Sequence, residues 1–385
     1  MGASCIGQGI RGERLHGADA GRIGVTLLYP HGACRWRRQC ESLVKRDNNF
    51  SSLGKRAKTC EIFSPATIAP FSPQSASAAL SIFHEPWWLD IATQGSWKLA
   101  TVNRNNQIIG EMPYTPTRLR LWRVAHLPPL TRTLGPVIKP VMGSIASQRH
   151  HRLDVTAKLI EQLPDCDSFF QVFDPRIDDA IAFALKGYSV SARYTFQIDA
   201  NCSTDEAWAN LDTKTRNVIR SADRNLTIAP IATPGEFTQF YEANLASRSR
   251  TNAYSSEIMR QLVKAFVERK SGTLLGAYGT GGRLVAAIGL VWDRHAAYYL
   301  LSSRVQDAHC GSISLLLWTG IQRALASKLT FDFDGFASPS TFHFLSAFGA
   351  TLRQRLAVER LGTGYSLARA LKRRIAPSTE FAPTL

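Results

Sequence analysis

Two kinds of sequence feature are scarce in this chain. No stretch of the sequence approaches the ~18 uninterrupted apolar residues of a membrane-spanning helix. Cysteine is also sparse, with seven among 385 residues, and no two cysteines have CxxC spacing. The sequence therefore predicts no transmembrane helix, no zinc knuckle and no structural disulfide.

Acidic residues are few compared with basic ones. Lys and Arg number 46 against 30 Asp and Glu, which gives a formal net charge of +16. The first 60 residues hold eleven Lys and Arg and only four Asp and Glu, so about +7 of the total lies there. A basic chain can bind nucleic acid, an anionic membrane or a phosphate-bearing substrate. No helix-turn-helix, zinc-finger or RNP motif is present, so we expect no stable nucleic-acid partner.

The two ends of the chain do not have the pattern of a folded domain. Residues 1–75 show no persistent apolar period, and Val25–Tyr29 is too short for the core of a signal peptide. An Arg-rich, acid-poor start is also typical of organellar transit peptides. We interpret residues 1–75 as a disordered or non-native Arg-rich extension, and residues 371–385 as a flexible tail.

Residues 76–200 predict one α/β unit. A hairpin, a helix, a strand, a second helix and a final strand follow one another. Their ranges are Trp97–Val102 with Gln107–Met112, Arg152–Leu163, Phe169–Phe173, Ile177–Leu185 and Ser189–Ile198.

Residues 201–370 repeat that order. Setting Leu99 against Leu275 aligns the two hairpins without a gap, and the helix at 312–327 then corresponds to the first helix of the earlier unit. The apolar strand FFQVFD corresponds to LTFDFD. Two copies of one fold are therefore predicted.

A basic helix is expected at 204–226, between the copies. Arginines at 216, 220 and 224 share one helix face, and like charges at that spacing repel. Lys214, Arg216 and Arg220 are therefore candidate ligands for the phosphates of a substrate. A solvated helix face is the alternative interpretation.

Two aspartates are the candidate acid–base groups. In FDFDG, alternation places Phe331 and Phe333 on one face of a strand and Asp332 and Asp334 on the other. Carboxylates so close raise one another's pKa, and one of them could serve as a general base. Asp before Gly also commonly forms an ordinary turn, which is the alternative.

The order of several segments resembles the GNAT acyltransferase fold in its Fem-type variant, the group that contains lipid II:glycine glycyltransferases. The resemblance covers residues 80–360. The matching segments are FHEPWWLD at 83–90, KTRNVIRSA at 214–222, Ser303-Arg304, LLLWTGIQRALASK at 315–328, FDFDGF at 331–336 and Phe348-Gly349-Ala350.

This resemblance implies two tandem GNAT-like halves of α/β (α+β) class, each a mixed, mostly antiparallel sheet flanked by helices. It implies a structural first half at 76–200 and a catalytic second half at 201–370. An acyl donor would lie where two parallel strands separate, with its pyrophosphate on amides at a helix start. Arg304, Gly311 and Ser312 occupy that position. The loop 306–312 departs from the family pattern because it keeps a single glycine and contains Asp307.

The implied activity is N- or O-acyl transfer from acyl-CoA, such as acetyl-CoA, without a metal. The acceptor would be an amine or hydroxyl of a small-molecule or glycan precursor of the cell envelope or a polysaccharide, in the cytoplasm. Tyr299 is the candidate acid for the leaving group. One alternative is a Fem-type peptidyltransferase that uses aminoacyl-tRNA, although no charged coiled-coil arm is found. A non-catalytic, basic nucleic-acid-binding protein is the other alternative. The sequence does not predict the oligomeric state.

Overall fold

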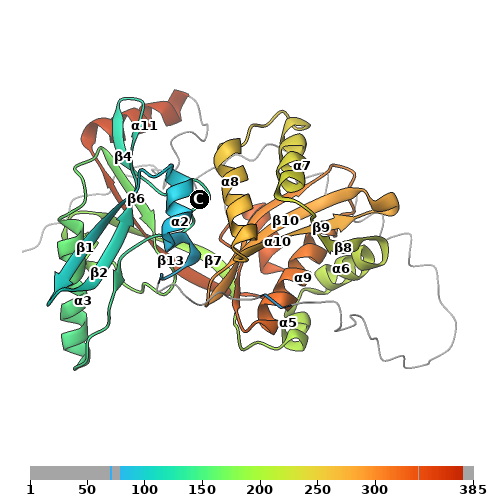
Figure 1. Ribbon diagram of the computed structural model, residues 1–385, viewed down its shortest axis with the longest axis horizontal. Helices are drawn as coiled ribbons and strands as arrows, with labels where there is room; N and C mark the ends of the chain where they lie inside the picture. Colours follow the sequence, from blue (N-terminus) through green and yellow to red (C-terminus); the bar gives the residue numbers. More distant parts are fainter. Residues whose placement is uncertain (1–69, 72–78, 337, 376–385) are drawn as a thin grey trace, which may run out of the picture.

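The computed structural model describes residues 70–71, 79–336 and 338–375 (Figure 1). The extension predicted at 1–75 lies outside these residues except for positions 70–71. Within the described ranges, no helix is long and apolar enough to cross a membrane.

The first half contains a 3₁₀-helix (labelled η), a short α-helix, seven strands and two further α-helices. In chain order they are η2 Ile82–His84, α2 Pro86–Thr93, β1 Lys98–Arg104, β2 Gln107–Tyr114, β3 Pro116–Leu119, β4 Trp122–Ala125, β5 Val137–Ile138, α3 Ile145–Ile160, β6 Ser168–Val172, α4 Ile181–Leu185 and β7 Ser189–Ile198.

The second half begins with helices and then alternates strands and helices. In chain order its elements are α5 Thr204–Asn210, α6 Thr213–Asn225, β8 Thr227–Pro230, α7 Pro234–Ala246, α8 Ser256–Glu268, β9 Gly272–Tyr278, η3 Thr280–Gly282, β10 Leu284–Trp292, β11 Ala296–Arg304, α9 Ser312–Ala326, β12 Thr330–Asp332, α10 Pro339–Ser346, β13 Thr351–Leu361 and α11 Thr363–Ile375.

One large sheet joins the two halves. Its strand order is β3-β4-β6-β13-β7-β12-β11-β10-β9-β8, while β1, β2 and β5 form a small separate sheet. Two of the pairs in the large sheet are parallel, β4 with β6 and β11 with β12. The corresponding parallel pair in each half supports the prediction of two copies of one fold.

The halves exchange their last strands. β7 belongs to the first half of the chain but pairs antiparallel with β12 of the second. Conversely, β13 comes from the second half and pairs antiparallel with β6 of the first. The exchanged strands also pair with each other, and Figure 1 shows them between the two halves. The mixed α/β class with two tandem α/β units predicted from the sequence is observed, but the two halves share a sheet.

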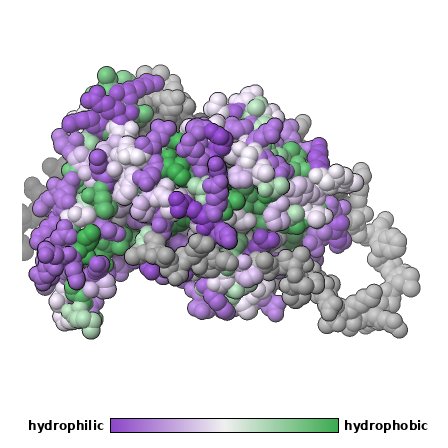
Figure 2. Space-filling view, viewed as in Figure 1, coloured by the Kyte–Doolittle hydropathy of each residue, from purple (hydrophilic) through white to green (hydrophobic). Residues whose placement is uncertain are grey.

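The sheet of the second half is covered on both faces. Ala286, Ile288 and Leu290 of β10 pack into an apolar cluster with α9, whereas Ala287 and Val291 pack into a second cluster with α7 and α8. A strand with both faces covered requires an unbroken apolar run, which explains the sequence LVAAIGLVW. On the face shown in Figure 2, the described apolar residues form small separated patches, because most of them lie in these interior clusters.

Two predicted boundaries were wrong. The single helix expected at 204–226 is α5 followed by α6, because Leu211 is extended and Asp212 caps α6 by accepting from the Lys214 amide. The tail expected from residue 371 is wrong for positions 371–375, which belong to α11, and the rest of that expected tail lies outside the described residues.

Candidate functional site

The parallel strands β11 and β12 separate after a short pairing. They are paired only from Ala296 to Tyr298 and from Thr330 to Asp332, and β11 then continues to Arg304 while β12 ends. The carboxyl end of β12 therefore opens next to a longer neighbour. Ligands of open α/β sheets commonly bind at such ends.

Asp332 is a fully buried carboxylate that four donors hold. It accepts from the Thr195 hydroxyl at 2.6 Å, the Gln197 amide at 2.7 Å and Arg355 Nη2 at 2.9 Å. The backbone N–H of Asp334 donates to it at 2.7 Å. Because these four donors satisfy the lone pairs of the carboxylate, Asp332 has a structural role and positions the residues after β12.

Asp334 lies between two arginines. Its carboxylate is 2.6 Å from Arg132 Nε and 3.2 Å from Arg355 Nη1, and its side chain is 3% exposed. Burial raises the pKa of Asp334 to about 6, against the lowering effect of Arg132 and Arg355. A carboxyl group that titrates near neutrality suits a general base.

Arg132 connects the separated strands. It lies between β4 and β5 in the first half, yet its Nη2 donates to the carbonyl of Leu300 on β11 at 3.0 Å. Its guanidinium also stacks over the ring of Tyr254, 5.5 Å from the centroid. Because Arg132 bridges Leu300 to Asp334, the first half of the chain forms part of the site.

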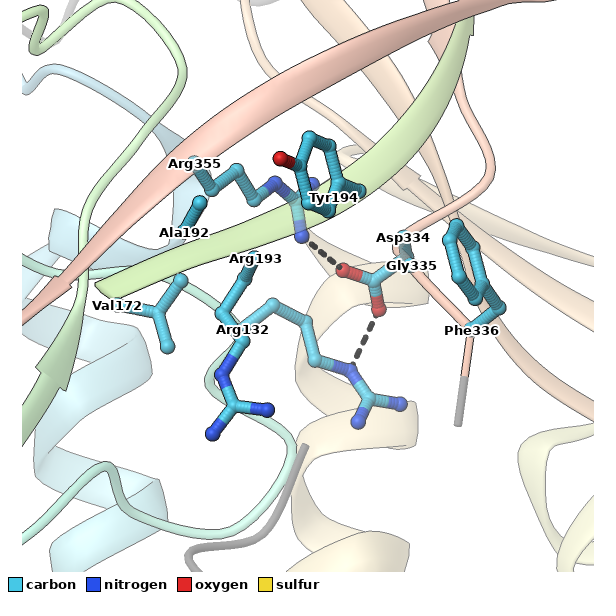
Figure 3. Close-up of a pocket in the computed structure, with 9 residues that line it drawn as sticks. All are labelled: Arg132, Val172, Ala192, Arg193, Tyr194, Asp334, Gly335, Phe336 and Arg355. Carbon is cyan, nitrogen blue, oxygen red and sulfur yellow. Dashed lines mark hydrogen bonds and ion pairs between the residues drawn. The ribbon is translucent and has the colours of Figure 1, made fainter. Parts of the chain in front are cut away.

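A cavity of about 170 Å³ opens beside Asp334. Its lining comes from the first half, from both exchanged strands and from the turn after β12 (Figure 3). The lining residues are Arg132, Val172, Ala192, Arg193, Tyr194, Asp334, Gly335, Phe336 and Arg355.

Of the three predicted acid–base residues, the structure brings two together. Asp332 and Asp334 both contact Arg355, but Asp334 alone of the three is a lining residue of the cavity. Tyr299 is half-buried against the apolar cluster that includes α9.

The loop at 306–312, which precedes α9 and is called the donor loop from here on, is held by hydrogen bonds between its own residues. The Gly311 amide donates to His309 Nδ1 at 3.0 Å, and the Ser312 amide donates to the His309 carbonyl at 3.0 Å. A Cβ on Gly311 would lie 2.5 Å from the carbonyl oxygen of Val218, so this glycine is required for α6 to approach. Ser312 is fully buried, and Asp307 pairs with Arg283. Phosphate binding at these amides would have to replace the His309 bonds.

The predicted phosphate ligands on α6 have contacts within the protein. Arg216 donates to the carbonyl of Ala209 at 2.7 Å, near the C-terminal end of α5, where a cation is favoured. The guanidinium of Arg220 lies 5.4 Å from the Trp208 ring centroid. Lys214 is exposed, and Arg304 is half-buried at the end of β11. None of these residues lines the cavity.

Sequence reasoning missed the three arginines of the cavity. Arg193 and Arg355 lie inside strands, and a charged residue in the middle of a long strand is a usable signal. In the β13 sequence LRQRLAVERL, however, hydrophobicity alone predicts that the leucines are buried and the arginines exposed. In the structure, Leu352 is 47% exposed and Arg355 is buried. No local signal identifies Arg132, which lies in a connection without regular structure.

Comparison with known proteins defines the class. Residues 213–345 match the family model described as an acetyltransferase (GNAT) domain. Residues 213–345 are therefore a GNAT-type domain. No curated protein sequence matches the chain.

Solved structures are similar to this chain over most of its length. The structure of FemX is 12% identical, covers 79% of this chain and 96% of its own, and has a TM-score of 0.55. The C-terminal domain of a putative lysylphosphatidylglycerol synthetase from Agrobacterium fabrum is 13% identical over 74% of this chain and 94% of its own, with a TM-score of 0.47. A tandem GNAT protein from the clavulanic acid biosynthesis pathway is 10% identical over 69% and 83%, with a TM-score of 0.43. The resemblance to the GNAT fold is confirmed for residues 213–345, and most of the chain shares the fold of FemX.

Proposed function

We propose that this protein is an acyltransferase that moves an acyl group from acyl-CoA, such as acetyl-CoA, to an amine or hydroxyl. The proposed acceptor is a small precursor of the cell envelope or of a polysaccharide, and the proposed location is the cytoplasm. The observation that carries the proposal is Asp334, a buried carboxyl group with a raised pKa that follows β12 and lines the cavity. The match of residues 213–345 to a GNAT acetyltransferase domain supports the same reaction class.

In the proposed reaction, the acceptor nitrogen or oxygen forms a bond to the acyl carbon and the carbon–sulfur bond of the thioester breaks. Asp334 takes the proton of the attacking group, since its pKa of about 6 leaves it mostly ionised at neutral pH. Tyr299 is the proposed donor of the proton that the departing thiolate takes. Arg132 and Arg355 hold Asp334 in place through their ion pairs.

The donor site proposed for coenzyme A comprises Arg304 and the amides of Gly311 and Ser312. Both amides are bonded to His309, at 3.0 Å each. A charge-assisted bond to a phosphate is about twice as strong as a neutral one, so bonds from these amides to a phosphate would more than replace their bonds to His309. His309 must therefore turn away when the donor binds. An aminoacyl-tRNA donor is the second candidate, and this closed loop with its single glycine is the observation that favours it.

Binding of acetyl-CoA tests the donor directly. We expect acetyl-CoA at 100 times its dissociation constant to stabilise the native protein by ~2.7 kcal/mol, measured as a rise in the thermal unfolding midpoint. CoA-dependent acyl transfer to an amine or hydroxyl acceptor should fall by about 10²- to 10⁴-fold in Asp334→Asn. Absence of any acetyl-CoA shift would contradict the donor assignment, and a shift with charged tRNA would favour the alternative.

A further inference from the structure

Two arginines lie directly opposite each other on the exchanged strands. In the antiparallel pairing of β7 with β13, Arg193 faces Arg355. Residues so paired have their side chains on the same sheet face with Cβ atoms about 4.5–5.5 Å apart, and like charges in that position repel. The pairing therefore requires negative charge nearby.

The carboxylates of the site compensate only part of this charge. Arg355 pairs with Asp332 and Asp334, and Arg132 pairs with Asp334. Both carboxylates of the site are therefore already paired with Arg355. Arg193 has no ion pair with any residue that the structure describes.

The same arginines have unused hydrogen-bond donors. The Nε atoms of Arg193 and Arg355 are both buried and have no hydrogen-bond partner among the described residues. The Arg355 side chain is only 5% exposed. A buried donor without a partner costs free energy, so a group that accepts from it would be favoured.

Both arginines line the cavity beside Asp334. In Figure 3, the guanidinium groups of Arg193 and Arg132 are directed to the same side of β7. At about 170 Å³ the cavity holds roughly five or six waters' share of liquid volume. That volume suits one small charged group and its neighbouring atoms.

We propose that this cavity binds a carboxylate or phosphate of the acceptor, held by Arg193 and Arg355. A guanidinium group presents donors in a planar fork that matches either group. Because Asp334 lines the same cavity, the anion would place an amine or hydroxyl a few atoms away next to the base. That this anionic ligand is the acceptor rests on the proposed function. It makes the acceptor an anionic small molecule, such as an amino acid or a phosphorylated amino or hydroxy compound, and it excludes a neutral glycan.

The test measures anion binding without acetyl-CoA. Thermal unfolding is followed in sodium acetate and in sodium phosphate, each against sodium chloride at equal ionic strength. We expect acetate or phosphate to raise the unfolding midpoint of the full chain, and the anion with the lower dissociation constant identifies the group. Arg193→Gln should weaken that binding by about ten- to a hundredfold, the value of a lost charged hydrogen bond.

The control is Arg353→Gln, because Arg353 is exposed on the same strand and does not line the cavity. This variant should keep the anion effect. In chloride alone, Arg193→Gln should unfold at the same or a higher temperature, since it removes an uncompensated charge; a structural role for Arg193 would lower that temperature. Equal midpoints in all three salts, or equal anion effects in both variants, would overturn the proposal. Anion binding without any acetyl-CoA binding would leave the pocket assigned and reject only the proposed acyl-CoA donor.

Discussion

The ion pairs of Arg355 hold the centre of the shared sheet together, and replacing this residue should be costly. Arg355 lies 2.9 Å from Asp332 and 3.2 Å from Asp334, and the three side chains are 5%, 0% and 3% exposed. Removing one partner of a buried pair leaves an uncompensated charge, at a cost of about 3–5 kcal/mol. Arg355→Met retains much of the side-chain volume, so the expected loss comes mainly from charge.

Urea denaturation measures this loss as a fall in the free energy of unfolding at an unchanged m-value. Arg353→Met, on the exposed part of the same strand, is the matched control and should stay within about 0.5 kcal/mol of the parent. In the double variant Asp332→Asn with Arg355→Met, the stranded charge at Asp332 is also removed. The double variant should therefore be more stable than the sum of the two single losses predicts, by about 0.5–3 kcal/mol.

The reasoning would be refuted in two ways. A loss below about 1 kcal/mol for Arg355→Met would mean that solvent reaches the carboxylates. Strict additivity in the double variant would mean that Asp332 and Arg355 are not coupled, despite the 2.9 Å between them.

Three further predictions concern the active site and the donor loop. Transfer activity should rise through pH about 6 as Asp334 ionises. Because its folded-state pKa is raised above 3.8, its own contribution to stability is present below 3.8 and lost as pH rises through about 6, so the thermal unfolding midpoint followed by circular dichroism should fall while the activity rises; activity and midpoint that fall together towards acid pH would contradict this assignment. Gly311→Ala should destabilise the protein by about 1–3 kcal/mol in urea denaturation, because the new methyl group would lie 2.5 Å from the Val218 carbonyl; a loss within 0.5 kcal/mol, as expected for an ordinary surface change, would contradict this close packing. His309→Ala frees the Gly311 amide and should tighten acetyl-CoA binding several-fold in calorimetry if these amides hold the pyrophosphate, whereas unchanged binding would locate the phosphates elsewhere.

Much of the fold was predictable because its signals are local. The predicted strand Ser189–Ile198 is β7, and the helix predicted at 312–327 is α9 to within a residue. Both aspartates contact Arg355, but the strand predicted over FDFDG ends at Asp332, and Asp334, with a φ of 63°, lies in the turn that an Asp-Gly pair also indicates. These features follow from apolar period and turn chemistry over a few residues.

The site was less predictable because its contacts join distant parts of the chain. Arg132 reaches the Leu300 carbonyl across 168 positions, and nothing near Arg132 in the sequence indicates that contact. Arg355 is buried because β13 is an interior strand whose charge is met by aspartates from β12 and the following turn. An alternation pattern identifies the two faces of a strand, but it does not identify which face meets a charged partner.

The strand exchange also means that neither half should fold alone. In the shared sheet, both neighbours of β7 belong to the second half, and both neighbours of β13 belong to the first. A chain that ends at residue 200 would leave β7 without either partner and β6 with an open edge, and open edges of this kind aggregate. We therefore expect residues 79–200 and residues 201–375 to be insoluble or unfolded when each is expressed alone. Co-expressed, they should form a one-to-one complex.

Acetyl-CoA and anion binding in that complex would distinguish the two sites. The anion cavity takes Arg132 and Arg193 from the first half and Asp334 and Arg355 from the second, so anion binding should appear only after the halves assemble. The donor loop and α9 belong wholly to the second half. A cooperative unfolding transition in either isolated half, at the midpoint of the intact chain, would show that the exchanged strands are dispensable. It would also remove the reason for placing the acceptor between the two halves.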